Sequence, residues 1–153
     1  MKLAEALIIR ADQQKRLEQL KQRLLRNAKA QEGDEPAEDP QALLREFEQV
    51  AAALVRLIQQ INRTNAATAF ENGDTLSDIL ARRDVLRLRQ DAFRSLAEAA
   101  TIEQSRFTRS EVRFLSTVQV AVIQRQADEL AQENRELDAR IQSANWATEM
   151  QEA

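Results

Sequence analysis

Residues 120–144 read VAVIQRQADELAQENRELDARIQSA, and this stretch decides the fold. Its seam side chains recur at alternating steps of three and four residues, the spacing of the a and d positions of a heptad. The residues on this line are Val120, Ile123, Ala127, Leu130, Asn134, Leu137, Ile141 and Ala144. The pattern predicts a helix packed against other helices, in which the polar Asn134 specifies register or oligomeric state.

Three earlier segments carry a similar apolar periodicity, and only 2 glycines and 2 prolines interrupt the 153 residues. Asp39 before Pro40 is a typical helix start, because an aspartate caps free N–H groups and proline suits the first helical position. Asn72-Gly73 is a typical helix end, since glycine readily adopts the left-handed conformation of a C-cap. We therefore predict further helices over residues 2–30, 41–72 and 76–102, with the last one over 120–144.

Two connections interrupt this pattern. Residues 31–40 hold five carboxylates and both prolines, which predicts an acidic surface loop. Between residues 103 and 119 the helical period fails, and strand-favouring side chains accumulate at 113–118. We expect an extended connection there, which crosses the bundle, folds back as a hairpin arm or is exchanged between subunits.

The short turn at Gly73 forces the flanking helices to be antiparallel. The predicted fold is therefore all-α, an antiparallel bundle of four long helices with coiled-coil-like seams, in one domain over residues 1–153. We find no internal repeat in the sequence.

Composition argues against most catalytic chemistry. The chain has no His, no Tyr and no Cys, so the usual general base, the commonest metal ligand and the thiol nucleophile are missing. Two isolated glycines cannot build a phosphate-binding loop. We expect no metal site and no cofactor, and the composition disfavours an enzyme.

Charge and hydropathy also indicate no particular partner or membrane segment. The 22 basic and 25 acidic side chains nearly balance, which gives no sign of a nucleic-acid or membrane partner. Glu5 and Arg10 interrupt the apolar start of the chain, so it does not read as a signal peptide. No window approaches the roughly 18 apolar residues of a membrane span. We expect a cytoplasmic protein.

A polar layer is the one candidate site. Folding the predicted helices back on each other places Arg10 level with Asn62, and Asn62 level with Asp84. Arg10 and Arg83 both point inward, where an unpaired guanidinium would be costly. The candidate residues are Arg10, Asn62, Thr64, Asn65, Thr68, Arg83 and Asp84. This layer would fix register, form an intersubunit site or bind a small anion or metabolite.

Several large apolar residues lie outside the predicted seams. They are Ile8 and Ile9 in the first helix and Val85, Leu88 and Leu96 in the third. One intramolecular core cannot cover them all, so we expect a homo-oligomer.

Several short motifs resemble the septicolysin-like family of bacterial proteins. They are residues 3–12 (LAEALIIRAD), 31–33 (QEG) with the acidic loop that follows, 62–65 (NRTN), 80–84 (LARRD), 109–111 (RSE) and 144–146 (ANW). The resemblance implies a helical fold of unknown activity. The leading hypothesis is a non-enzymatic helical interaction or assembly protein. The alternatives are a cytolysin-like membrane-active protein and a small-ligand-binding bundle that uses the polar layer.

Overall fold

The structure, a computed structural model, describes residues 1–102 and 112–151. It contains four helices: α1 (Leu3–Arg26), α2 (Pro40–Ala67), α3 (Leu76–Ala100) and α4 (Val120–Ala147). Within the described ranges the extended pairing is confined to two isolated β-bridges. The prediction of an all-α fold with four long helices is confirmed.

The described chain divides into two compact units, and the single domain over residues 1–153 stays a prediction. One unit comprises Met1–Ser77 with Ser143–Ala153, and the other comprises Asp78–Gln142. The first therefore holds α1 and α2, and the second holds most of α3 and α4. We describe each unit by itself.

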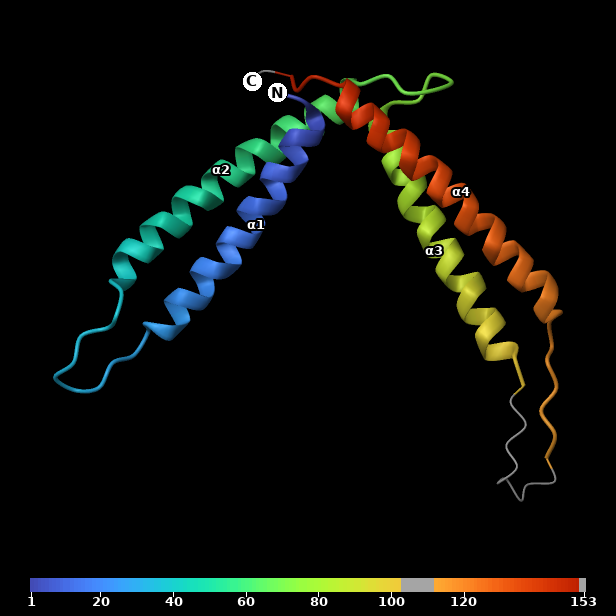
Figure 1. Cartoon of the computed structure of the whole chain (residues 1–153), viewed down its shortest axis with the longest axis horizontal. Coiled ribbons are helices and arrows are strands. Elements are labelled where there is room, and N and C mark those ends of the chain that lie inside the picture. The colour runs from blue at the N-terminus through green and yellow to red at the C-terminus, as the bar shows by residue number, and fades with distance from the viewer. Residues whose placement is uncertain (103–111, 152–153) are drawn as a thin grey trace. The chain divides into compact units, whose positions relative to one another are not determined.

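In the first unit, α1 and α2 lie side by side as a hairpin (Figure 1). Arg16 pairs with Glu46 and Arg23 pairs with Glu38, which shows that the two helices run antiparallel. Buried residues follow one stripe on each helix, as the heptad spacing requires. They include Leu3, Ala6 and Leu20 on α1, and Leu43, Leu54, Leu57 and Ile61 on α2.

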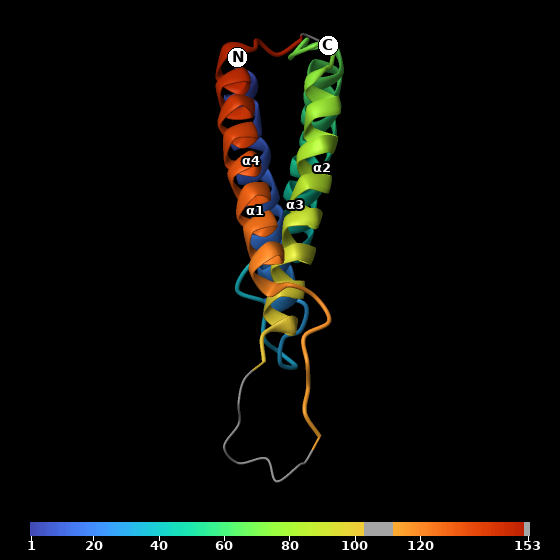
Figure 2. The same ribbon diagram turned by 90° about the vertical axis from the view of Figure 1, so that its right-hand side faces the viewer.

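In the second unit, α3 and α4 also run side by side (Figures 1 and 2). Their seam includes Ile79, Leu86 and Ala97 on α3, and Ala127, Leu130, Leu137 and Ile141 on α4. Asn134 lies in this seam, and its Nδ2 donates a hydrogen bond to Gln90 Oε1 at 3.2 Å. The polar position predicted from the heptad thus joins the two helices of one hairpin.

Helix α2 ends at Ala67 and not at residue 72 as predicted. The Thr68 hydroxyl donates to the carbonyl of Thr64, and the extended backbone of Thr68 leaves the helix. Asn72 and Gly73, at φ +53° and +87°, instead form the tip of the turn that leads to α3. Glycine marks the turn correctly, but the helix stops one residue before Thr68.

The other helix ends differ from the prediction by two to four residues. Helix α1 stops at Arg26 and not at residue 30, because the Asn27 side chain bonds the Arg23 carbonyl. Helix α3 stops at Ala100, whereas α4 continues beyond residue 144 to Ala147. Residues 103–111 of the predicted extended connection lie outside the described residues, and 112–119 carry no helix or strand.

The two hairpins repeat one another, so the expectation of no internal repeat is wrong. Leu57, Ile61, Asn65 and Thr68 of the first hairpin recur as Leu137, Ile141, Asn145 and Thr148 of the second, at identical spacing. Ile61 and Ile141 are both fully buried, and both asparagines are buried. On the first helix of each hairpin, Leu3, Ala6 and Arg10 recur as Leu76, Ile79 and Arg83.

Backbone hydrogen bonds confirm this correspondence. Leu76 N donates to Thr68 O at 2.8 Å, and Leu3 N donates to Thr148 O at 2.9 Å. A second pair matches as well, since Phe70 N donates to Asp74 O and Met150 N donates to Met1 O, both at 2.9 Å. The segment after α2 therefore bonds the start of α3, and the segment after α4 bonds the start of α1 in the same way.

The repeat predicts equal costs for truncating its equivalent core residues. Ile61→Ala and Ile141→Ala should each lower the free energy of unfolding by about 2–5 kcal/mol, because both side chains are fully buried. Urea titration at fixed protein concentration measures this loss. Val55→Ala, at an exposed position of α2, is the control and should change stability by less than about 0.5 kcal/mol. A neutral effect at either isoleucine would contradict the assignment.

Candidate functional site

The first unit is closed by a contact between the two ends of the chain, which we call the terminal clasp. It consists of residues 1–3, residues 148–151 and Thr64. Thr64 Oγ1 donates to Gln60 O at 2.9 Å and accepts the Gln151 N–H at 3.1 Å. The Met150 sulfur lies 3.7 Å from the same hydroxyl. A buried threonine of α2 thus anchors the segment that follows α4.

Three of the seven predicted site residues gather near this clasp. Thr64 and Asn65 are buried and Thr68 is half-buried, and the Thr68 carbonyl accepts the Leu76 N–H described above. Asn62 is exposed and does not join them. The sequence placed polar residues correctly at this end of α2, but it did not reveal the tail that covers Thr64.

Arg10 occupies a different level from the one predicted. The pairs Arg16–Glu46 and Arg23–Glu38 place Arg10 level with residues 51–52 of α2, nearly three turns from Asn62. The predicted level assumes that the two helices pair about the middle of the loop. Glu38, however, lies back against the last turns of α1, so α2 begins level with the interior of α1.

The inward direction predicted for Arg10 is nevertheless found. Arg10 is half-buried, and its Nε is buried without a hydrogen-bond partner among the described residues. Gln13, almost one turn further along α1, has its Oε1 in the same situation. Buried polar atoms normally find partners, so these two positions need an explanation.

Arg83 and Asp84 lie in the second unit, so the layer that would join them to Arg10 remains a prediction. Arg83 is 20% exposed, and its Nη2 lies 3.2 Å from Asp84 Oδ1. Asp138 on α4 was not predicted, yet its Oδ1 lies 3.7 Å from Arg83 Nη1 and 3.2 Å from Arg87 Nη2. Asp84 itself is 66% exposed.

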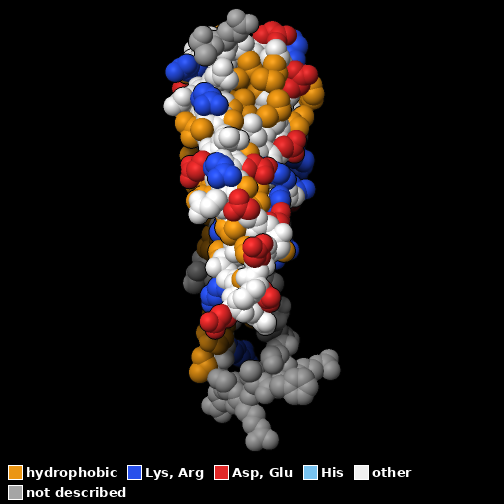
Figure 3. Space-filling model, turned by 90° about the vertical axis from the view of Figure 1, so that its left-hand side faces the viewer, with side chains coloured by type: hydrophobic (Ala, Val, Ile, Leu, Met, Phe, Trp, Pro, Cys, Tyr) orange, Lys and Arg blue, Asp and Glu red, His pale blue; other side chains and the backbone are white. Residues whose placement is uncertain are grey.

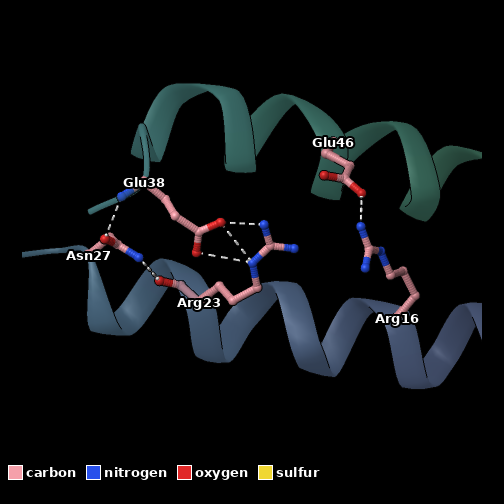
Figure 4. A network of polar contacts seen from close by, with 5 residues as sticks. All are labelled: Arg16, Arg23, Asn27, Glu38 and Glu46. Atoms are coloured by element: carbon pink, nitrogen blue, oxygen red, sulfur yellow. Dashed lines mark hydrogen bonds and ion pairs between the residues drawn. The ribbon is translucent and has the colours of Figure 1, made fainter. Parts of the chain in front are cut away.

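A second polar network lies at the loop end of the α1–α2 hairpin (Figure 4). Arg23 holds Glu38 through two guanidinium nitrogens, with Nε 3.1 Å from Oε2. Asn27 Oδ1 accepts the Glu38 N–H at 3.0 Å. The hydrogen bond from Arg23 holds the pKa of Glu38 below its usual value. The acidic loop, predicted as solvated, is thus partly fixed to α1.

The clasp carries a similar ion pair at its surface. Glu149 lies 2.7 Å from Lys2 Nζ and 3.2 Å from the N-terminal amine. Hydrogen bonds from Lys2 and then from the amine lower the pKa of this carboxyl. Charge attraction therefore reinforces the backbone bonds between the two chain ends.

The described surface offers open grooves for binding. Groove A, of about 410 Å³, runs between α1 and α2 beside Ile9, Asp12, Gln13, Arg16, Val50 and Ala53. Groove B, of about 390 Å³, runs along α3 beside Ala81, Arg82, Val85, Leu86, Arg89 and the α4 residue Glu133.

The described residues contain no cluster of three carboxylates placed to hold a metal ion. None of the described helices combines the length and apolar character needed to cross a membrane.

These features define an all-α protein of paired long helices, closed by a clasp between its termini. The chain belongs to a family of unknown function (DUF6847), which matches residues 10–150. It is also similar to a crystal structure of a functionally unknown conserved protein from Corynebacterium diphtheriae. That similarity has 44% identity and a TM-score of 0.93, and covers 99% of each chain. No curated protein matches the chain.

The ion pairs predict unequal roles for two aspartates. Asp84→Ala should cost about 0–1 kcal/mol of unfolding free energy, because Asp84 is exposed and sits beside Arg83 on one helix. Asp138→Ala should cost more, since it removes the cross-helix acceptor of two arginines. Urea titration compares the two variants. A larger loss for Asp84→Ala would contradict this arrangement.

The lowered pKa values predict a pH dependence. Glu38 and Glu149 have folded pKa values below the unfolded value of about 4.3, so their stabilisation is present above that pH and is lost as pH falls through the folded pKa. The urea midpoint should therefore fall between about pH 5 and pH 3. The double variant Glu38→Gln, Glu149→Gln should show a smaller fall. Glu48→Gln, exposed on α2, is the matched control.

Proposed function

We propose that this protein is a non-enzymatic helical assembly protein that acts as a homo-oligomer. The observation that carries the proposal is the exposure of large apolar side chains in both units. Ile8 is 54% exposed, Val85 56% and Leu88 71%. Two helices bury one shared stripe, so apolar residues beside that stripe require another partner.

These exposed residues are numerous and spread along both hairpins. The first unit contributes Ile8, Ile9, Leu25, Leu44 and Val55, and the second contributes Val85, Leu88, Leu96 and Val122. Figure 3 shows one face of the molecule, on which hydrophobic side chains gather between charged ones. Charged residues at the edge of an apolar patch are typical of protein interfaces, whose rims are polar.

Polar positions in the seams also support assembly. Arg10 and Gln13 on α1 and Asn134 on α4 each have a buried atom without a partner among the described residues. Such positions cost stability in an isolated helical pair. In coiled coils, a single polar seam residue is known to specify register and oligomeric state.

The ligand-binding alternative has less support. It uses the predicted polar layer, and within that layer the Thr64 hydroxyl already contacts Gln60, Met150 and Gln151. The resemblance to septicolysin-like proteins remains a prediction, because the family matched here has no known function. We therefore do not propose a membrane-active role.

Static light scattering after gel filtration tests self-association. At micromolar concentration the mass should be a multiple of the 17.4 kDa of one chain. Leu88→Gln should shift the population toward the monomer, because it places an amide at an apolar contact. Glu98→Gln, exposed on the same helix, should leave the mass unchanged. A monomer at all concentrations would refute the proposal.

A further inference from the structure

Grooves A and B are the same surface of the repeated hairpin. With Leu3 aligned to Leu76 and Ile61 aligned to Ile141, most of the residues that line the two grooves fall at matching positions. Ile9, Asp12, Gln13, Arg16 and Ala53 of groove A correspond to Arg82, Val85, Leu86, Arg89 and Glu133 of groove B. The position of the groove is therefore kept between the hairpins, while most of its side chains differ.

The differences make the two grooves complementary. Asp12 in groove A has no ion pair among the described residues, and neither has Arg89 in groove B. Each groove also presents an exposed apolar side chain, Ile9 in A and Val85 in B. Groove B facing another groove B would bring Arg89 close to the Arg89 of the second copy, whereas Arg82 is already paired with Glu133. Like charges so placed oppose that pairing.

The flanking helices favour the same combination. Helix α1, beside groove A, carries 6 basic and 3 acidic residues, whereas α4, beside groove B, carries 3 basic and 5 acidic residues. Contact of A with B can therefore place the basic α1 beside the acidic α4, while α3, which forms most of groove B, carries 5 basic and 4 acidic residues. Contact of A with A would place two basic helices together.

We propose that groove A of one chain packs against groove B of a second copy, with Asp12 facing Arg89. The inference rests on the proposed self-association and names its interface. Two antiparallel hairpins joined in this way form a four-helix unit, in which matching heptads let ridges enter grooves. Each chain has one groove of each kind, so every chain can contribute either side of this contact.

Cysteine cross-linking tests this interface directly, because the chain has no native cysteine. Ala53→Cys marks groove A, and Ala81→Cys marks groove B. Mixing the two full-length variants with a short bismaleimide should give a cross-linked pair of chains that contains one variant of each kind. Either variant alone should react much more slowly. Ala139→Cys, exposed on α4, is the control partner for Ala53→Cys and should cross-link weakly.

A charge exchange provides the second arm of the test. Asp12→Arg introduced into the Ala53→Cys chain should reduce the cross-linking rate several-fold. Adding Arg89→Asp to the Ala81→Cys chain should restore it. Each outcome is decisive: fast cross-linking of Ala53→Cys alone, or an oligomer without A-to-B cross-links, would overturn this interface. The last result would leave self-association standing, whereas a monomeric mass would remove both proposals.

Discussion

A pair of antiparallel helices can bury only the stripe that the two helices share, and this constraint governs both units. In the first unit the stripe runs from Leu3 to Leu20 on α1 and from Leu43 to Ile61 on α2. Side chains beside it, such as Ile8 and Val55, stay exposed although they are large and apolar. The hydrophobic effect therefore continues to favour association after the hairpin has formed. The proposed self-association therefore rests on the geometry of the pair more than on any single residue.

The terminal clasp repeats a backbone bond that is also made at the covalent turn. Between α2 and α3 the covalent turn holds Thr68 against Leu76, whereas between α4 and α1 the same backbone bond joins Thr148 to Leu3 without a covalent link. The clasp, which has no covalent link, is also held by ion pairs. Lys2 and the N-terminal amine pair with Glu149. The repeat thus explains why residues near the two chain ends contact each other.

The heptad made the helices predictable and also concealed the repeat. Steps of three and four identify a seam anywhere, so any two such helices can be aligned, and the seam residues alone do not identify a duplication. The evidence lies in Asn65 with Asn145 and in the backbone bonds beside them. The inward direction of Arg10 was also predictable, because a helix turns by a fixed angle per residue. Its level was not, since it depends on how Glu38 folds back against Arg23.

The two seam arginines show how the repeats have diverged. Arg83 has the cross-helix acceptor Asp138, whose counterpart in the first hairpin is the apolar Ile58. Arg10 therefore occupies the same seam position without that acceptor, and its Nε remains unpaired among the described residues. A buried unpaired donor lowers stability, so an arginine at this position does not help an isolated pair of helices to pack. The arrangement is better explained if the first hairpin finds a polar partner outside its own two helices, as a hairpin that docks onto another would.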